Sequence, residues 1–337
     1  MLSDVLEKRI KGCLVGVAAG DAMGMPSSMM SPETIQNTFG HIDTFLPAPD
    51  GHLLHHGMAA GAVTDDTQQT LLIADSIIAN GDIDPQDIAQ RLIRWGEEIR
   101  AFDSMAVGPS SLRALHAIKS GKSIYEAGRA GDTNGAVMRI APVGLLGCGN
   151  RDKTLDLVSR ACIPTHNTNI AIAGAAAVAM AIGLALQGEQ DVDSLIKSSI
   201  EIIEPAMKLG NTWYSASIHD RATLALDIVT RAQDRAEAMS KLYRVIGAGV
   251  QISETVPTCL ALTRLVDGDP VQGVIAAANL GGDCDTIGAI TGGMCGAIKG
   301  IDAFPGDWIE LLSATNNIDF DWYAGKLYHL ITGKEYL

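Results

Sequence analysis

Two short acidic clusters hold the residues of this chain that are best suited to chemistry. One lies in the segment 279–286 (NLGGDCDT), which places two carboxylates and a hydroxyl within its last four residues. The other, far upstream, is the segment 64–67 (TDDT). Carboxylates this close repel one another, so each raises the pKa of its neighbour unless a cation lies between them. Each cluster therefore suggests a site for a hard divalent cation.

An EF-hand loop is the first cation site to test against the downstream cluster. Asp283, Asp285 and Gly288 would occupy loop positions 1, 3 and 6. Position 12 would then be Met294, where an EF-hand needs a bidentate Glu. The sequence excludes an EF-hand.

Both clusters lead directly into apolar runs, so each is expected at a helix N-terminus, where free N–H groups favour anionic side chains. A single cluster of this kind would be explained by helix capping alone. Two clusters that meet in space would supply four carboxylates and at least two hydroxyls. That is a suitable ligand set for two hard divalent cations.

The two clusters and three further segments resemble the ADP-ribosylglycohydrolase family, of the dinitrogenase-reductase-activating glycohydrolase type. The further segments are 16–26 (GVAAGDAMGMP), 134–142 (NGAVMRIAP) and 165–167 (THN). The resemblance implies an all-α fold, with residues 1–337 forming a single large orthogonal helical bundle. It also implies hydrolysis of a glycosidic bond at ribose C1, in substrates that carry ADP-ribose on arginine, serine or related groups.

The resemblance also implies which residues form the site. The expected cation ligands, for two Mg²⁺ or Mn²⁺ ions, are Thr64, Asp65, Asp66, Asp283, Asp285 and Thr286. The expected catalytic residues are Asp65, Asp66, Asp103 and Asp285. The expected substrate contacts are Asp21, Asn134, Gly135, Met138, Arg139 and His166. Paired cations would fix the ribose hydroxyls and lower the pKa of a bound water, and a carboxylate would act as base.

Four of these residues have alternative explanations or irregular surroundings. Asp21 follows a helical pattern over residues 5–20 and would also serve as a cap or turn residue. The guanidinium of Arg139 suits an ion pair as well as a substrate contact. His166 is expected at the N-terminus of the Ala-rich run that follows it, and a lone His is more often structural than catalytic. The spacing around Asp103 departs from the usual family pattern.

Two positions differ from the residues that the family commonly has. A Glu usually follows the GDAMGMP segment closely, whereas Ser27, Ser28 and two Met residues stand here, and the nearest downstream acid is Glu33. Cys284 stands between the two downstream acids, where Thr is expected. The missing Glu leaves open either the catalytic assignment at this edge of the site or the substrate itself.

Two other functions therefore remain open. The first is an N-ribosyl hydrolase of a small nucleoside-like metabolite, which the scarcity of aromatic residues for stacking an adenine favours. The second is a metal-stabilised ADP-ribose-binding protein without turnover. The intact set of acidic ligands argues against this second alternative.

The segment 40–62 is expected to be a long loop, because it contains several Pro and Gly residues. It also holds His52, His55 and His56, which together suggest a zinc site, although no acid stands beside them in the sequence. Short His-rich stretches are often non-functional, so a zinc site is the less favoured interpretation. A loop directly before an acidic cluster could instead act as a lid over the substrate.

The bulk composition favours helices over sheets. Aromatic residues make up only 4% of the 337 residues, whereas Gly numbers 36, which suits helices that pack through small side chains. No strand alternation of convincing length is present. Helices are expected over 67–80, from Asp84-Pro85 onwards and over 256–265 with Pro257 in the first turn, whereas 132–142 is expected to be a loop.

Charge and cysteine usage narrow the partners and the compartment. The net charge of −14 argues against nucleic acid and anionic membranes as partners. The six cysteines lack CxxC spacing and no secretory signal is visible, so a cytoplasmic protein with buried thiols is expected. The apolar run 170–186 approaches transmembrane length, but a buried central helix explains it better. Nothing in the sequence indicates the oligomeric state.

Overall fold

The computed structural model describes residues 2–103 and 107–333. These residues form helices joined by loops and contain three isolated β-bridges but no strand, so the predicted all-α bundle is confirmed. The helices of the first half are α1 (Leu2–Gly24), α2 (Pro32–Phe39), α3 (Asp65–Asn80), α4 (Pro85–Glu98), α5 (Pro109–Lys119), α6 (Ile124–Ala127), α7 (Ala141–Gly147) and α8 (Arg151–His166).

The helices of the second half are α9 (Asn169–Gln187), α10 (Val192–Glu201), α11 (Ile203–Ala206), α12 (Ile218–Arg231), α13 (Arg235–Lys241), α14 (Ile252–Leu265), α15 (Pro270–Ala278), α16 (Cys284–Lys299), α17 (Gly306–Asn316) and α18 (Phe320–Thr332). Short 3₁₀ turns cover Met25–Ser27, Ala101–Asp103, Asn134–Ala136 and Ile301–Ala303, and a π-helical turn covers Leu242–Ile246.

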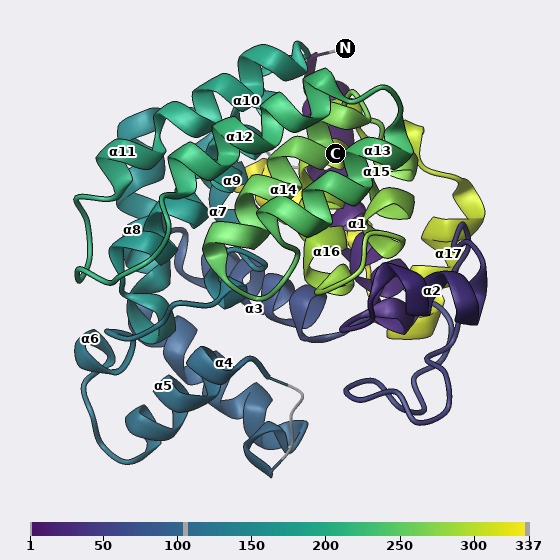
Figure 1. Cartoon of the computed structure of the whole chain (residues 1–337). Coiled ribbons are helices and arrows are strands. Elements are labelled where there is room, and N and C mark those ends of the chain that lie inside the picture. The colour runs from purple at the N-terminus through teal and green to yellow at the C-terminus, as the bar shows by residue number, and fades with distance from the viewer. Residues whose placement is uncertain (1, 104–106, 334–337) are drawn as a thin grey trace.

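Helices α1 and α16 pack backbone to backbone in the centre of the molecule (Figure 1). Glycines recur at every fourth residue on the facing sides, and Gly12 lies against Gly296 just as Gly24 lies against Cys284, so the helices are antiparallel. A Cβ added to Gly20 would lie 1.9 Å from the carbonyl oxygen of Gly288. Small residues therefore bring the C-terminal end of α1 beside the N-terminal end of α16, where Asp283 and Asp285 lie.

Helix α9 is the Ala-rich run and is a core helix. It is long and apolar enough to cross a membrane, but 94% of its most apolar window is buried inside the protein. Its neighbours include α7, α8, α10, α14 and α16, which cover it on several sides. One hydrophobic core draws on residues from Ile10 to Tyr328. This shared core is in keeping with a single domain over residues 1–337, which remains a prediction.

Local signals in the sequence locate several helix ends correctly. Asp84 caps α4, with Pro85 at its first position, and Gly81 ends α3 in the left-handed conformation. The predicted loop over 132–142 contains a 3₁₀ turn at Asn134–Ala136, and its last two residues begin α7.

The predicted first-turn position of Pro257 is wrong. Helix α14 begins at Ile252, so Pro257 lies inside it. Proline has no N–H and leaves the carbonyl four residues earlier without its helical partner. That carbonyl belongs to Ser253, and the Arg221 guanidinium donates to it at 3.2 Å. A tertiary contact thus accommodates a residue that normally ends a helix.

Candidate metal and substrate site

The N-terminus of α3 is held by a carboxylate from another helix. Asp21 of α1 is fully buried and accepts hydrogen bonds from the backbone N–H groups of Thr64 and Thr67 at 3.0 and 3.1 Å. It also accepts from both threonine hydroxyls, at 2.8 and 2.5 Å. Because Asp21 and Thr64 do the capping, Asp65 and Asp66 in the first turn are not needed as caps.

The N-terminus of α16 is held by the backbone instead. Gly282 has a φ of +83°, and a Cβ there would lie 2.1 Å from the carbonyl oxygen of Ala248. The N–H of Gly282 donates to Met30, and the N–H of Asp283 donates to Ala248 at 2.7 Å. The Asp283 carboxylate makes no capping hydrogen bond of its own. Like Asp65 and Asp66, it is left for another use.

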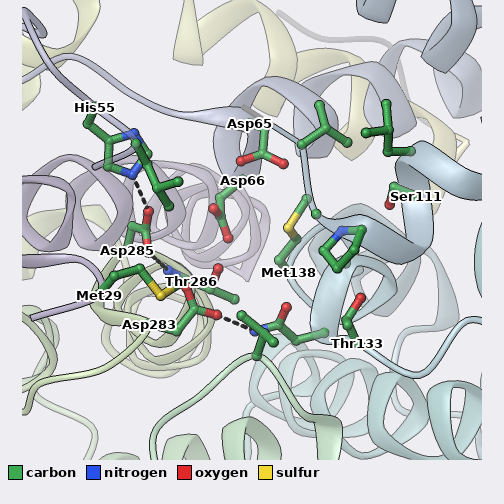
Figure 2. A pocket seen from close by; sticks show the side chains of 18 of the residues that line it. Met29, His55, Asp65, Asp66, Ser111, Thr133, Met138, Asp283, Asp285 and Thr286 are labelled. Carbon is green, nitrogen blue, oxygen red and sulfur yellow. Dashed lines mark hydrogen bonds and ion pairs between the residues drawn. The ribbon is translucent and has the colours of Figure 1, made fainter. Parts of the chain in front are cut away.

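A cavity of about 400 Å³ lies where these two helix ends meet. Figure 2 shows Asp65, Asp66, Asp283 and Asp285 on one side of it, with Ser111 and Thr133 on the opposite side. Most of its wall comes from the N-terminal ends of α3 and α16, the loop 53–55, the start of α5 with the residues before it, and the segment 133–138. Met29 and Val250 complete the lining. In Figure 1 the loop after α2 and the group α4 to α6 project below the main body, and both contribute to the cavity.

Three of the four cavity carboxylates have raised pKa values. Burial, followed by the negative charges of Asp285 and Asp21, raises the pKa of Asp65 to about 7. Burial and the charge of Asp65 raise the pKa of Asp66 well above its ordinary value. Burial and the charge of Asp285 do the same for Asp283. The cavity thus brings together carboxyl groups that disfavour one another's ionisation.

Asp285 is the exception, because two side chains and the backbone N–H of Thr286, at 3.0 Å, bind its carboxylate. His55 Nε2 lies 2.8 Å from Asp285 Oδ2, and the Ser28 hydroxyl donates to Oδ1 at 2.7 Å. Burial alone would raise the pKa of Asp285, but the hydrogen bond and charge of His55, helped by Ser28, hold it at about 2. The same pair raises the pKa of His55, although burial acts to lower it. His55 and Asp285 form a buried ion pair at the edge of the cavity.

The donor chemistry of this cavity fits divalent cations. Oδ1 of Asp66 is buried with no hydrogen-bond partner, which costs free energy unless something binds it. Hard oxygen donors are what Mg²⁺ and Mn²⁺ prefer. In the described part of the chain, no three His, Cys, Asp or Glu side chains already form an ion-binding group. Asp285 is turned to His55, and Asp283 accepts from Asn134 at 2.5 Å, so ion binding would require these side chains to reorient.

The predicted substrate contacts fall into two groups. Asn134, Gly135 and Met138 line the cavity. Arg139, His166 and Asp21 are at most 2% exposed and lie behind the cavity wall. Arg139 donates to Gln69 Oε1, and Gln69 donates to Asp65 Oδ2 at 3.0 Å, so Arg139 is connected to the acids through one side chain. The geometry favours a positioning role for this second group over direct contact.

His166 lies at the end of a helix, and Asp103 directly precedes the residues that the structure does not describe. His166 is the last residue of α8 and does not begin α9, because Thr168 supplies the cap of α9 by accepting from the N–H of Ala171. The predicted N-terminal placement of His166 is therefore wrong. Asp103 ends a 3₁₀ turn, and its side chain lies outside the described part of the structure.

The model of one protein family, the ADP-ribosylglycohydrolases, matches residues 2–336 of the chain. The chain belongs to this family. An uncharacterized protein of Escherichia coli K12, YegU, is 39% identical over 322 residues, which cover 95% of this chain and 96% of the relative. The human ADP-ribosylhydrolase ARH3 is 26% identical over 330 residues, with coverages of 89% and 88%.

A solved structure described as an ADP-ribosylglycohydrolase-related protein complex has the same fold. It superimposes with a TM-score of 0.68 at 26% identity and covers 98% of this chain and all of that one. Membership in the ADP-ribosylglycohydrolase family supports a hydrolase that acts on ADP-ribosylated substrates.

The sequence did not predict two contacts and two lining residues of this candidate site. The contact of His55 with Asp285 spans 230 positions, and that of Ser28 spans 257. No acid stands beside the histidines in the sequence, but Asp285 lies beside His55 in space. Ser111 and Thr133 also line the cavity, and only the position of Thr133 directly before Asn134 hinted at a role.

Proposed function

We propose that the protein hydrolyses the glycosidic bond at ribose C1 of an ADP-ribosylated substrate with the help of two divalent cations, Mg²⁺ or Mn²⁺. The observation that carries this proposal is the convergence of four carboxylates, from two helix N-termini, in one cavity of an ADP-ribosylglycohydrolase. The raised pKa values of three of them and the unpartnered oxygen of Asp66 support cations as the missing partners.

The residues that would hold the cations are Thr64, Asp65, Asp66, Asp283, Asp285 and Thr286. Cations at this position would supply Lewis acidity and bind the vicinal hydroxyls of a ribose. Thr64 does not line the cavity, and its hydroxyl lies within hydrogen-bond distance of Asp21 and Asp66, so it would need to turn to reach an ion. Thr286 lines the cavity directly.

The chain's own groups would orient the reaction. Gln69 holds Oδ2 of Asp65, which leaves Oδ1 for the cavity and makes Asp65 our candidate for the general base. Asp66, Asp285 and Asp103 remain the other candidates for catalytic carboxylates. The apolar side chains of Met29, Leu53 and Leu54 line the cavity and would exclude bulk water from a bound substrate.

The lining also favours a second candidate function. Among the described residues, the cavity is lined by no Phe, Tyr or Trp side chain that could stack on an adenine. An N-ribosyl hydrolase of a smaller nucleoside-like metabolite would use the same cations and would need less of the cavity. A binder without turnover remains the third and weakest candidate.

The test is hydrolysis of ADP-ribosyl-arginine in ¹⁸O-labelled water with Mg²⁺ or Mn²⁺. We expect one labelled oxygen in the released ADP-ribose, loss of the reaction with a chelator, and loss in Asp285→Ala. The matched control is Glu310→Ala, which removes an exposed acid outside the cavity. Labelled product from nucleosides alone would favour the second candidate. If no ribosylated compound gives labelled product, both enzymatic candidates are contradicted.

The remaining predictions concern partners and location. We propose that the substrate is an ADP-ribosylated protein or small molecule, that nucleic acid and membranes are not partners, and that the protein is cytoplasmic. The net charge of −14 and the burial of α9 support these proposals.

A further inference from the structure

A chain of buried side chains connects Arg139 to the cavity wall on the side opposite the acids. The guanidinium of Arg139 donates through Nη2 to the hydroxyl oxygen of Thr165. That oxygen lies 2.8 Å from Nδ1 of His166, and Nε2 of His166 lies 3.3 Å from the hydroxyl oxygen of Thr133. Thr165 and His166 are fully buried, whereas Thr133 lines the cavity and is labelled in Figure 2.

The direction of these hydrogen bonds follows from Arg139, which is the first donor in the series. A guanidinium can only donate, so Thr165 accepts from Arg139. The single hydrogen of the Thr165 hydroxyl then needs an acceptor, because a buried hydroxyl hydrogen without one is costly. The acceptor within reach is Nδ1 of His166. The proton of a neutral His166 therefore resides on Nε2.

His166 is well suited to remain neutral. Burial, and then the positive charges of Arg139 and Arg113, lower its pKa well below the ordinary value. A neutral ring with its proton on Nε2 donates to the Thr133 hydroxyl oxygen. The hydrogen of the Thr133 hydroxyl has no acceptor among the described side chains and backbone groups, and it is free to point into the cavity.

The neighbouring Gly135 leaves room for this arrangement. A Cβ at Gly135 would lie 2.9 Å from Cε1 of His166 and 3.0 Å from the hydroxyl oxygen of Ser111. Gly135 thus allows the imidazole to approach the wall. The backbone of Thr133 is fixed by its bridge to Gln251, and the N–H of Asn134 donates to Val250 at 2.9 Å. Thr133 has a fixed backbone and a directed hydroxyl.

We infer that Thr133 determines specificity by donating its hydroxyl hydrogen to an oxygen acceptor of the substrate, and that Arg139, Thr165 and His166 are positioning residues that fix this polarity. The acceptor is a phosphate, hydroxyl or carbonyl oxygen on the part of the ligand farthest from the four carboxylates. A ligand group that can only donate is disfavoured at Thr133. This inference rests on the proposed function only in taking ADP-ribose as the ligand.

The first test measures ADP-ribose binding by calorimetry in the presence of Mg²⁺. Thr133→Val keeps the side-chain shape but removes the donor, and we expect its Kd to rise about fivefold to tenfold. Thr133→Ser keeps the hydroxyl and is expected to remain within about twofold of the wild type. In turnover, Thr133→Val should raise KM and leave kcat nearly unchanged, because a ground-state contact is lost. Equal Kd values for Thr133→Val and wild type would overturn the inference.

The second test needs neither ligand nor turnover. Nitrogen-15 NMR of the histidine side chains reports which ring nitrogen of His166 carries the proton. We expect the Nε2–H form, unchanged from about pH 5.5 to pH 8. A proton on Nδ1 would overturn the polarity and with it the inference. A wild type that binds ADP-ribose but hydrolyses no substrate would contradict the proposed function alone.

Discussion

His55 lies 2.8 Å from Asp285, and this buried pair joins the long loop after α2 to the N-terminus of α16. The loop therefore reaches the acids that we propose as cation ligands and contributes Leu53, Leu54 and His55 to the cavity. Its lid function remains a prediction. The contact indicates how a lid at this position would be anchored.

His55→Ala tests the lid. We expect a changed KM or kcat, because the loop loses its contact with Asp285, while bound cations are retained because the carboxylates remain. His56→Ala is the matched control, since this exposed neighbour does not line the cavity. Elemental analysis and steady-state kinetics measure both. The zinc alternative would instead be supported if the wild type contains stoichiometric zinc and the triple replacement of His52, His55 and His56 by Ala loses it.

Ser28→Glu tests the position where the family commonly has a Glu. Ser28 is 1% exposed, and its hydroxyl binds Asp285. A Glu there would add charge and bulk in a buried place, so we expect lower turnover of the native substrate. Ser28→Ala, which removes about 1 kcal/mol of hydrogen bonding, separates the loss of the hydroxyl from the added carboxylate. A gain in activity on ADP-ribosyl-arginine would show that a carboxylate at this edge restores a missing function.

The raised pKa values predict how pH affects the metal-free protein. Asp65 has a folded pKa of about 7, above its unfolded value, so the native state binds more protons than the unfolded state between these two values. The free energy of unfolding in a chelator should therefore fall as pH rises from about 5 to 8. Saturating Mg²⁺ should flatten this dependence, because cations replace the protons. A metal-free protein whose stability rises over this range would contradict the crowding of the acids.

Gly20→Ala tests the contact between α1 and α16. The added methyl group would meet the backbone of Gly288, so we expect a loss of about 1–3 kcal/mol in the free energy of unfolding. Gly306→Ala is the control, because a Cβ there meets nothing within 4 Å, and its effect should stay within about 0.5 kcal/mol. Denaturant unfolding measures both. If Gly20→Ala is as stable as Gly306→Ala, the two backbones are not in contact.

The sequence predicts features whose causes are local. Thr64 and Asp84 cap helices through groups two or three residues away, and Gly81 ends one through its own φ angle, so composition and spacing are enough. The two acidic clusters were recognised in the same way. Their meeting in one cavity was expected from the resemblance, which carries three-dimensional information that spacing lacks.

Features with distant causes were missed or misplaced. Nothing near Pro257 indicates that Arg221 will bind the carbonyl freed by the proline. Nothing near His166 shows that α8 continues through it and that only Asn167 and Thr168 leave the helical conformation before α9 begins. The placement of Arg139 behind the wall likewise depends on Gln69 of α3 and Thr165 of α8.

The most direct test of the central claim is a crystal structure of the protein grown with Mn²⁺, in which anomalous diffraction locates the ions. We predict two ions, about 3.5–4 Å apart as in other two-metal sites, with ligands from both 64–66 and 283–286. A single ion, or ligands from only one of the two clusters, would contradict the proposal that both helix N-termini build one binuclear site.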